Sequence, residues 1–120
     1  MVEPSLRVLA LVTDAFGGRG GIAQYNRDFL SSLATCDRIG DVIVLPRARA
    51  TQLGTLPSGV RQLPPPKGRL AFSVAALGAA RAHRPIDVVF CGHLFLAPLA
   101  AVIARLLHAR LWVQVHGIEA

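Results

Sequence analysis

Short apolar runs alternate along the chain with segments in which apolar residues recur at helical spacing. The first run, residues 6–13, is apolar at nearly every position, which is typical of a strand buried on both faces of a parallel sheet. From Gly21 the period changes. One stripe of an amphipathic helix is then formed by Ile22, Tyr25, Phe29, Leu30 and Leu33. The opening of the chain therefore predicts a strand, a glycine-rich turn and a helix.

The remaining sequence continues this alternation. Further apolar runs predict strands at residues 41–46, 60–63, 87–91 and 111–115. Further helices are predicted at residues 70–83 and 96–108. Helical spacing in the first of these is shown by Leu70, Val74, Leu77 and Arg81. Strands that alternate with helices predict an α/β fold: an open, doubly wound, mostly parallel Rossmann-like sheet of about five strands with three helices.

The size of the chain limits it to one domain. It has 120 residues, of which 52% are apolar, enough for a single core but not for a two-domain enzyme. The sequence stops shortly after the last predicted strand, where a functional loop is expected. We therefore expect residues 1–120 to form one partial, N-terminal domain of a longer protein. We also expect self-association through the apolar strand Leu111–Val115, which would lie at the sheet edge.

The charge balance favours anionic partners. The formal net charge is +6, which suits phosphorylated small molecules and the surface of an anionic membrane. The arginines are scattered singly and no aromatic residues are interleaved with them, so nucleic acid is not an expected partner. Cys36 and Cys91 are too far apart for a chelating pair, and we expect two buried thiols in a reducing cytoplasm. The apolar stretch 88–104 predicts a strand, a turn and a helix rather than a membrane span.

The glycine cluster after the first strand is a candidate anion site. Four glycines lie there, Gly17, Gly18, Gly20 and Gly21. Glycine lets the backbone approach a ligand closely, and the start of the following helix presents free N–H groups to an anion. Arg19 lies inside this segment, where its guanidinium can meet a phosphate. The segment therefore predicts a phosphate or diphosphate cradle.

Two histidines come directly after predicted strands. His93 follows the fourth strand and His116 the fifth, so both should reach the crevice at the carboxyl ends of the strands. His83 and His108 instead lie at predicted helix ends, where we expect capping roles. Several cations are expected near the mouth of the crevice as solvated surface charges: Arg47, Arg49, Arg69 and Lys67.

Together, three stretches of the sequence resemble a known family. These are residues 6–9 (Leu-Arg-Val-Leu), 20–25 (Gly-Gly-Ile-Ala-Gln-Tyr) and 115–119 (Val-His-Gly-Ile-Glu). They are similar to the N-terminal domain of GT-B glycosyltransferases, in particular the retaining family 4 enzymes. The resemblance implies that this domain mainly binds the acceptor, while a C-terminal domain, absent from this sequence, binds most of the nucleotide-sugar donor. It also implies that the second glycine of the pair approaches the donor diphosphate and that His116 contacts the donor sugar.

The sequence thus predicts the front part of a glycosyltransferase that moves a sugar from a nucleotide-diphosphate sugar to a hydroxyl of a glycan or lipid-linked acceptor. His116 is the candidate catalytic residue, and Gly18, Gly20 and Gly21 are candidates for binding the diphosphate. Candidate acceptor or crevice-lining residues are Arg19, Tyr25, His93 and Glu119. No cofactor is expected, and no metal, because an Asp-x-Asp carboxylate pair is absent. Without the donor domain we expect this chain alone to be inactive.

Two alternatives remain open. Gly18-x-Gly20-x-x-Ala23 formally matches the dinucleotide fingerprint, and the second strand ends in Leu45-Pro46-Arg47 without a carboxylate. Arg47 and Arg49 would then hold a 2′-phosphate, so an NADP-binding oxidoreductase domain is one alternative. The other is a non-catalytic domain that binds or assembles, based on the apolar strand near the C-terminus.

Overall fold

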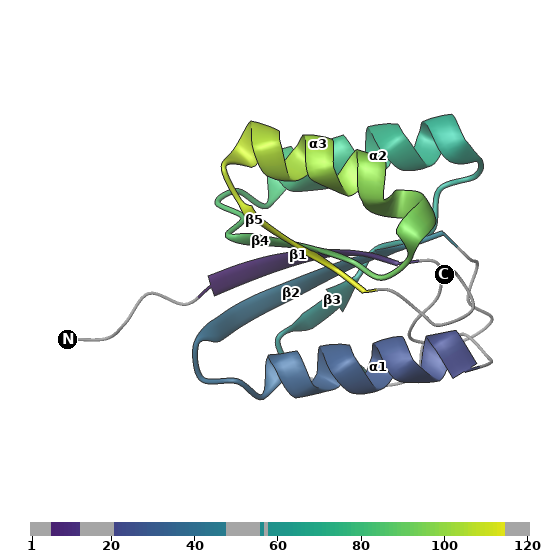
Figure 1. Ribbon diagram of the computed structural model, residues 1–120. Coiled ribbons are helices and arrows are strands. Elements are labelled where there is room, and N and C mark those ends of the chain that lie inside the picture. The colour runs from purple at the N-terminus through teal and green to yellow at the C-terminus, as the bar shows by residue number, and fades with distance from the viewer. Residues whose placement is uncertain (1–5, 13–20, 48–55, 57, 115–120) are drawn as a thin grey trace.

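The computed structural model describes residues 6–12, 21–47, 56 and 58–114, and within these the side chains of all but 21–26 and 94. The strands are β1 (Leu6–Val12), β2 (Ile39–Pro46), β3 (Val60–Gln62), β4 (Val88–Cys91) and β5 (Arg110–Val113). The helices are α1 (Gly21–Ala34), α2 (Arg69–Ala82) and α3 (Ala97–Leu107), and a short 3₁₀ turn, η1 (Leu94–Leu96), precedes α3. The predicted order of elements is confirmed (Figure 1).

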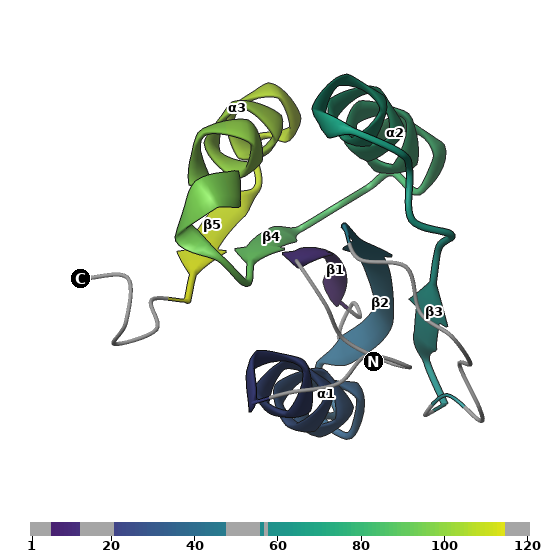
Figure 2. The ribbon, with the colours of Figure 1, turned by 90° about the vertical axis from the view of Figure 1, so that its right-hand side faces the viewer.

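The five strands form one sheet in the order β3-β2-β1-β4-β5, and every neighbouring pair is parallel. In the central register, Leu9 of β1 lies opposite Ile43 on one side and Val89 on the other. Helix α1 covers one face of the sheet, whereas α2 and α3 lie side by side on the other (Figures 1 and 2). The expected doubly wound α/β fold is therefore present. From β1 the chain first builds β2 and β3 on one side and then β4 and β5 on the other.

Each face of the sheet has its own core. Towards α1, strand residues such as Val8, Val44 and Phe90 pack with Leu30, and the ring of Phe29 stacks on Phe90 at a centroid distance of 4.7 Å. The core on the other face contains strand residues and the inner sides of α2 and α3. Its larger buried members are Leu9, Leu11, Ile43, Leu45, Phe72, Val89 and Ile103. Strand β1 is buried from Val8 to Val12 because both faces are covered.

Helix α2 forms where its spacing predicts, but the large apolar residues that indicate it are not its buried side. Leu70, Val74 and Leu77 are exposed. The side that meets the sheet instead consists of Phe72, Ala76, Ala79 and Ala80. Small alanines let the helix lie close to the sheet, so the larger side chains point away from it.

Of two further local predictions, one is confirmed and the other is wrong in part. His83 and His108 do cap α2 and α3: the N–H of each donates to a carbonyl oxygen four residues earlier, and His108 has a left-handed φ of 55°. The expectation of two buried thiols is wrong for one of them, because Cys36 is exposed while Cys91 is buried. Cys36 follows the end of α1 in the turn towards β2, where none of the described helices and strands covers it.

Strand β5 lies at the end of the described sheet and all four of its residues are exposed. The poorly covered apolar strand expected from the sequence is therefore present, although Val115 lies outside the described residues.

The amino ends of the strands are held by polar contacts. Arg7 pairs with Asp41 at 3.1 Å and donates to the carbonyl oxygen of His83 at 2.8 Å, and its backbone N–H donates to Asp87 at 2.8 Å.

Candidate functional site

The carboxyl ends of three strands meet at one edge of the sheet. The N–H of Gly92, directly after β4, donates to the carbonyl oxygen of Leu11 in β1 at 2.8 Å, and the N–H of Arg47, directly after β2, donates to that of Val12 at 2.9 Å. Because the connections from β1 and β4 diverge to opposite sides, this edge contains the topological switch point. Ligands of open α/β sheets bind in that position.

The start of α1 belongs to this edge. Strand β1 ends at Val12 and α1 begins at Gly21, so the glycine-rich connection runs from the carboxyl end of β1 to the N-terminus of the helix. No acidic residue lies in the first turn of α1, so no side-chain carboxylate there competes with a ligand for the positive end of the helix dipole. Gly18, Arg19 and Gly20 lie outside the described residues, and Gly21 is the first residue of the helix.

His93 lies directly after β4 and is held in place by its neighbours. Its Nδ1 accepts a hydrogen bond from the backbone N–H of Phe95 at 3.2 Å, and its ring lies 4.7 Å from the ring of Phe95, centroid to centroid. Its carbonyl oxygen accepts from the Cys91 thiol and from the N–H of Leu96, both at 2.9 Å. With Nδ1 as acceptor, the neutral imidazole carries its proton on Nε2, which becomes a hydrogen-bond donor.

A cavity of about 410 Å³ opens between the first turns of α2 and α3, and its lining includes Phe95, whose ring contacts that of His93. Its lining residues are Arg47, Arg69, Phe72, Ser73, Phe95, Leu96, Pro98 and Leu99. The guanidinium of Arg47 lies 5.6 Å from the centroid of the Phe72 ring, so a cation–π contact positions it at the cavity wall. None of the described residues that line the cavity carries a carboxylate. The cavity therefore suits an anionic ligand that also has an apolar part.

The sequence predicts Arg47 and Arg69 to be solvated surface charges near the mouth of the crevice. Both are exposed, as expected, and both also line this cavity. The sequence does contain a signal that these arginines lie near a site, because Arg47 directly follows β2 and Arg69 is the first residue of α2. Both positions belong to the carboxyl edge of a parallel sheet. Phe95 could not be placed from the sequence, because its position depends on the 3₁₀ turn η1.

The remaining predicted site residues are only partly placed. Tyr25 belongs to α1, but its side chain is outside the description. His116 and Glu119 lie beyond the described residues. The last described residue, Gln114, donates its N–H to the carbonyl oxygen of Cys91 at 2.8 Å, so the end of β5 lies beside the end of β4. The chain thus reaches the same edge two residues before His116.

No protein-family model, no curated protein and no solved structure matches this chain. Within the described ranges, none of the helices is both long and apolar enough to cross a bilayer. The same part of the chain contains no group of three or more His, Cys, Asp and Glu side chains placed to hold a metal ion.

Proposed function

We propose that this chain is the acceptor-side, N-terminal domain of a GT-B glycosyltransferase similar to the retaining family 4 enzymes. The reaction moves a sugar from a nucleotide-diphosphate sugar to an acceptor hydroxyl. The observation that carries the proposal is the switch point, where β1 leads through the glycine pair into the N-terminus of α1 and β4 is followed by Gly92 and His93. The resemblance at residues 20–25 and 115–119 supplies the reaction class.

In this proposal, backbone groups stabilise the leaving diphosphate. Negative charge grows on the diphosphate as the bond to the sugar breaks, and the free N–H groups and dipole at the start of α1 favour that charge. Gly20 and Gly21 allow the diphosphate to approach the backbone closely. His116 orients the donor sugar, and His93 lines the crevice in which donor and acceptor meet. The remaining donor contacts belong to a second domain outside these 120 residues.

The cavity between the first turns of α2 and α3 is the proposed acceptor pocket. Its two guanidinium groups, from Arg47 and Arg69, favour an acceptor with a phosphate or carboxylate group, and Phe72 and Phe95 supply an apolar wall. Such a ligand fits the lipid-linked or glycan acceptors that the resemblance implies. We place the protein on the cytoplasmic side of a membrane, in keeping with free thiols at Cys36 and Cys91.

The direct test is sugar transfer by the protein that carries this sequence together with its donor domain. His116→Ala should lower kcat by on the order of 10²- to 10³-fold, because it removes a group that contacts the reacting sugar. His108→Ala is the matched control, because His108 caps α3 at the opposite edge of the sheet. Equal transfer by the His116→Ala variant and the unchanged protein would remove His116 from the site.

One observation favours an oxidoreductase domain as a second candidate. The sheet order β3-β2-β1-β4-β5 is also that of dinucleotide-binding domains, and Arg47 directly follows β2, where an NADP enzyme holds the 2′-phosphate. Thermal denaturation of this chain with NADPH, and separately with UDP-glucose and GDP-mannose, distinguishes the two. Stabilisation by NADPH but by neither nucleotide sugar would replace the proposed function with this one.

The exposure of β5 favours a third candidate, a non-catalytic domain that assembles through this strand. An unpaired apolar edge strand is a template for pairing with another chain. Sedimentation of the unchanged chain and of Leu111→Lys tests it. A dimer that the lysine abolishes supports assembly through β5, and a monomer at high concentration contradicts it.

A further inference from the structure

The outer surface of α2 and α3 is apolar where a helix surface is usually polar. On α2, Leu70, Val74 and Leu77 are 79%, 62% and 43% exposed. On α3, Val102 and Leu106 are 54% and 65% exposed. The two helices lie side by side as the outermost layer of this face, and no other helix or strand in the described part of the chain covers them (Figures 1 and 2). These five side chains are called the outer apolar patch below.

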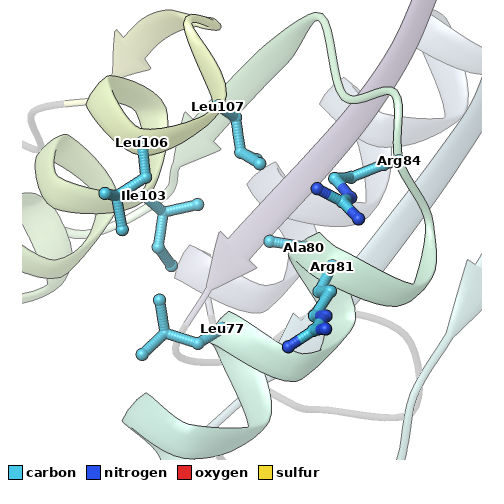
Figure 3. Close-up of a pocket in the computed structure, with 7 residues that line it drawn as sticks. All are labelled: Leu77, Ala80, Arg81, Arg84, Ile103, Leu106 and Leu107. Atoms are coloured by element: carbon cyan, nitrogen blue, oxygen red, sulfur yellow. The ribbon is translucent and has the colours of Figure 1, made fainter.

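A groove runs between the two helices within this patch. It encloses about 360 Å³, and its apolar walls come from Leu77 and Ala80 on α2 and from Ile103, Leu106 and Leu107 on α3. The side chains from the two helices face one another across it, and the guanidinium groups of Arg81 and Arg84 lie along one side (Figure 3). The groove therefore has apolar walls and positively charged guanidinium groups along one side.

The charge around the patch has a single sign. Four exposed arginines flank it, Arg69 at the start of α2 and Arg81, Arg84 and Arg105 near the ends of the helices. Among the described residues, none of the four forms an ion pair with a carboxylate. Between residues 69 and 110 the sequence has one carboxylate, Asp87, which instead accepts a hydrogen bond from the backbone of Arg7 at the amino ends of the strands.

We infer that the outer apolar patch and its arginines bind the surface of an anionic membrane. The leucines and valines enter the boundary between headgroups and acyl chains, while the longer arginine side chains keep their guanidinium groups at the level of the lipid phosphates. Basic residues next to an anionic leaflet each add to the attraction. This inference concerns attachment and does not depend on sugar transfer.

The charge and the shape of the outer apolar patch both favour a membrane over other binding partners. A second copy of the chain would bring four arginines against four arginines, which opposes pairing. An acidic protein would satisfy the charge, but the exposed apolar side chains are spread over two adjacent helices in one outer layer, which matches a planar lipid surface. A bilayer supplies the negative charge and the apolar interior at the depths that the arginines and leucines require.

The experiment is co-sedimentation of the full 120-residue chain with phosphatidylcholine vesicles, with and without phosphatidylglycerol. The chain should bind only the vesicles that contain phosphatidylglycerol, and binding should be lost between about 0.1 M and about 1 M NaCl as the charges are screened. Replacing Arg81 and Arg105 with glutamine should lower the partition coefficient about 25-fold, about fivefold per arginine. The matched control replaces Arg38 and Arg61, which lie off this face, and should leave most of the binding.

A second measurement reports which side chains enter the membrane. In a Cys36→Ser background, an NBD fluorophore on Leu106→Cys should shift to the blue with anionic vesicles, whereas the same fluorophore on Ser31→Cys in α1 should not. No binding to anionic vesicles, equal loss of binding in the Arg38 and Arg61 control, or equal shifts at the two labels would overturn the inference. A dimer that Leu77→Ser with Leu106→Ser abolishes would assign the patch to a second copy and also overturn it.

Discussion

The two faces of the sheet are covered by helices of different design. On one face, α1 packs large side chains such as Leu30 and Phe29 inwards and exposes polar ones such as Asp28 and Ser32. On the other face, α2 and α3 pack alanines such as Ala76 and Ala100 inwards and expose leucines and valines. Within residues 27–34, the described outer side chains of α1 form an ordinary polar surface. The outer surface of α2 and α3 has the apolar composition that is typical of an interaction surface.

This comparison explains why periodicity alone assigns a helix but not its buried side. In α1 the described part of the apolar stripe, Phe29, Leu30 and Leu33, packs against the sheet, because large side chains fill the space between helix and sheet there. In α2 that space is filled by Phe72 and by alanines, and the large residues lie outside. Alanine contributes little to a hydrophobic pattern, yet it allows the closest approach of a helix to a sheet.

Two adjacent residues of α3 give the strongest test of which side of this helix is buried and which is exposed. Ile103 is buried and Val102 is exposed. Ile103→Ala should lower the free energy of unfolding by about 2–5 kcal/mol, because it leaves a cavity in the core, whereas Val102→Ala should change it by less than about 0.5 kcal/mol. Urea denaturation measures both. Similar losses for the two variants would mean that the described orientation of α3 is wrong.

A smaller effect is expected when a large residue is placed on the alanine side. Ala76→Leu in α2 should destabilise the fold by about 1–3 kcal/mol, because the side chain has no room against the sheet. Ala71→Leu, at an exposed position of the same helix, is its control and should be close to neutral. If Ala76→Leu were neutral in thermal denaturation, the close approach of α2 to the sheet would be refuted.

Loss of the polar contacts at the amino ends of the strands should lower the free energy of unfolding by about 1–2 kcal/mol. Arg7→Met removes the side-chain hydrogen bonds to His83 and Asp41, each contributing about 1 kcal/mol or less at this partly exposed position. Arg61→Met, an exposed arginine in β3, should have little effect on the unfolding midpoint in urea. Because Arg7 lies at the opposite edge from the candidate site, ligand binding should be unchanged in both variants, and a loss of binding in Arg7→Met would count against that location.

The smallest predicted effect is a stabilisation on the α2/α3 face. Gly78 lies in α2, and a Cβ added there would meet no atom within 4 Å. Gly78→Ala should therefore raise stability by about 0.5–1 kcal/mol, because alanine loses less conformational freedom in a helix. Calorimetry should show a higher Tm. An unchanged or lower Tm would indicate that position 78 is not a free, exposed helical site.

Most of the fold could be predicted from the sequence, because strands buried on both faces and helices of constant period leave strong local patterns. The runs at 6–13 and 87–91 predicted β1 and β4 closely. The candidate site was less accessible, since Arg47, Arg69 and Phe95 are brought together only by the strand order and by η1. The exposure of Cys36 was missed because a turn residue carries no periodic signal.

We propose that the diphosphate group of a nucleotide sugar binds where β1, α1 and β4 meet. The most direct test is an NMR titration of the ¹⁵N-labelled chain with UDP and with GDP, following backbone amides. We expect the largest shifts at Gly21, Gly92 and His93, with Arg7 and Asp87 at the opposite edge unchanged. Shifts centred on Arg7 and Asp87, or none at the carboxyl edge at saturating nucleotide, would contradict it.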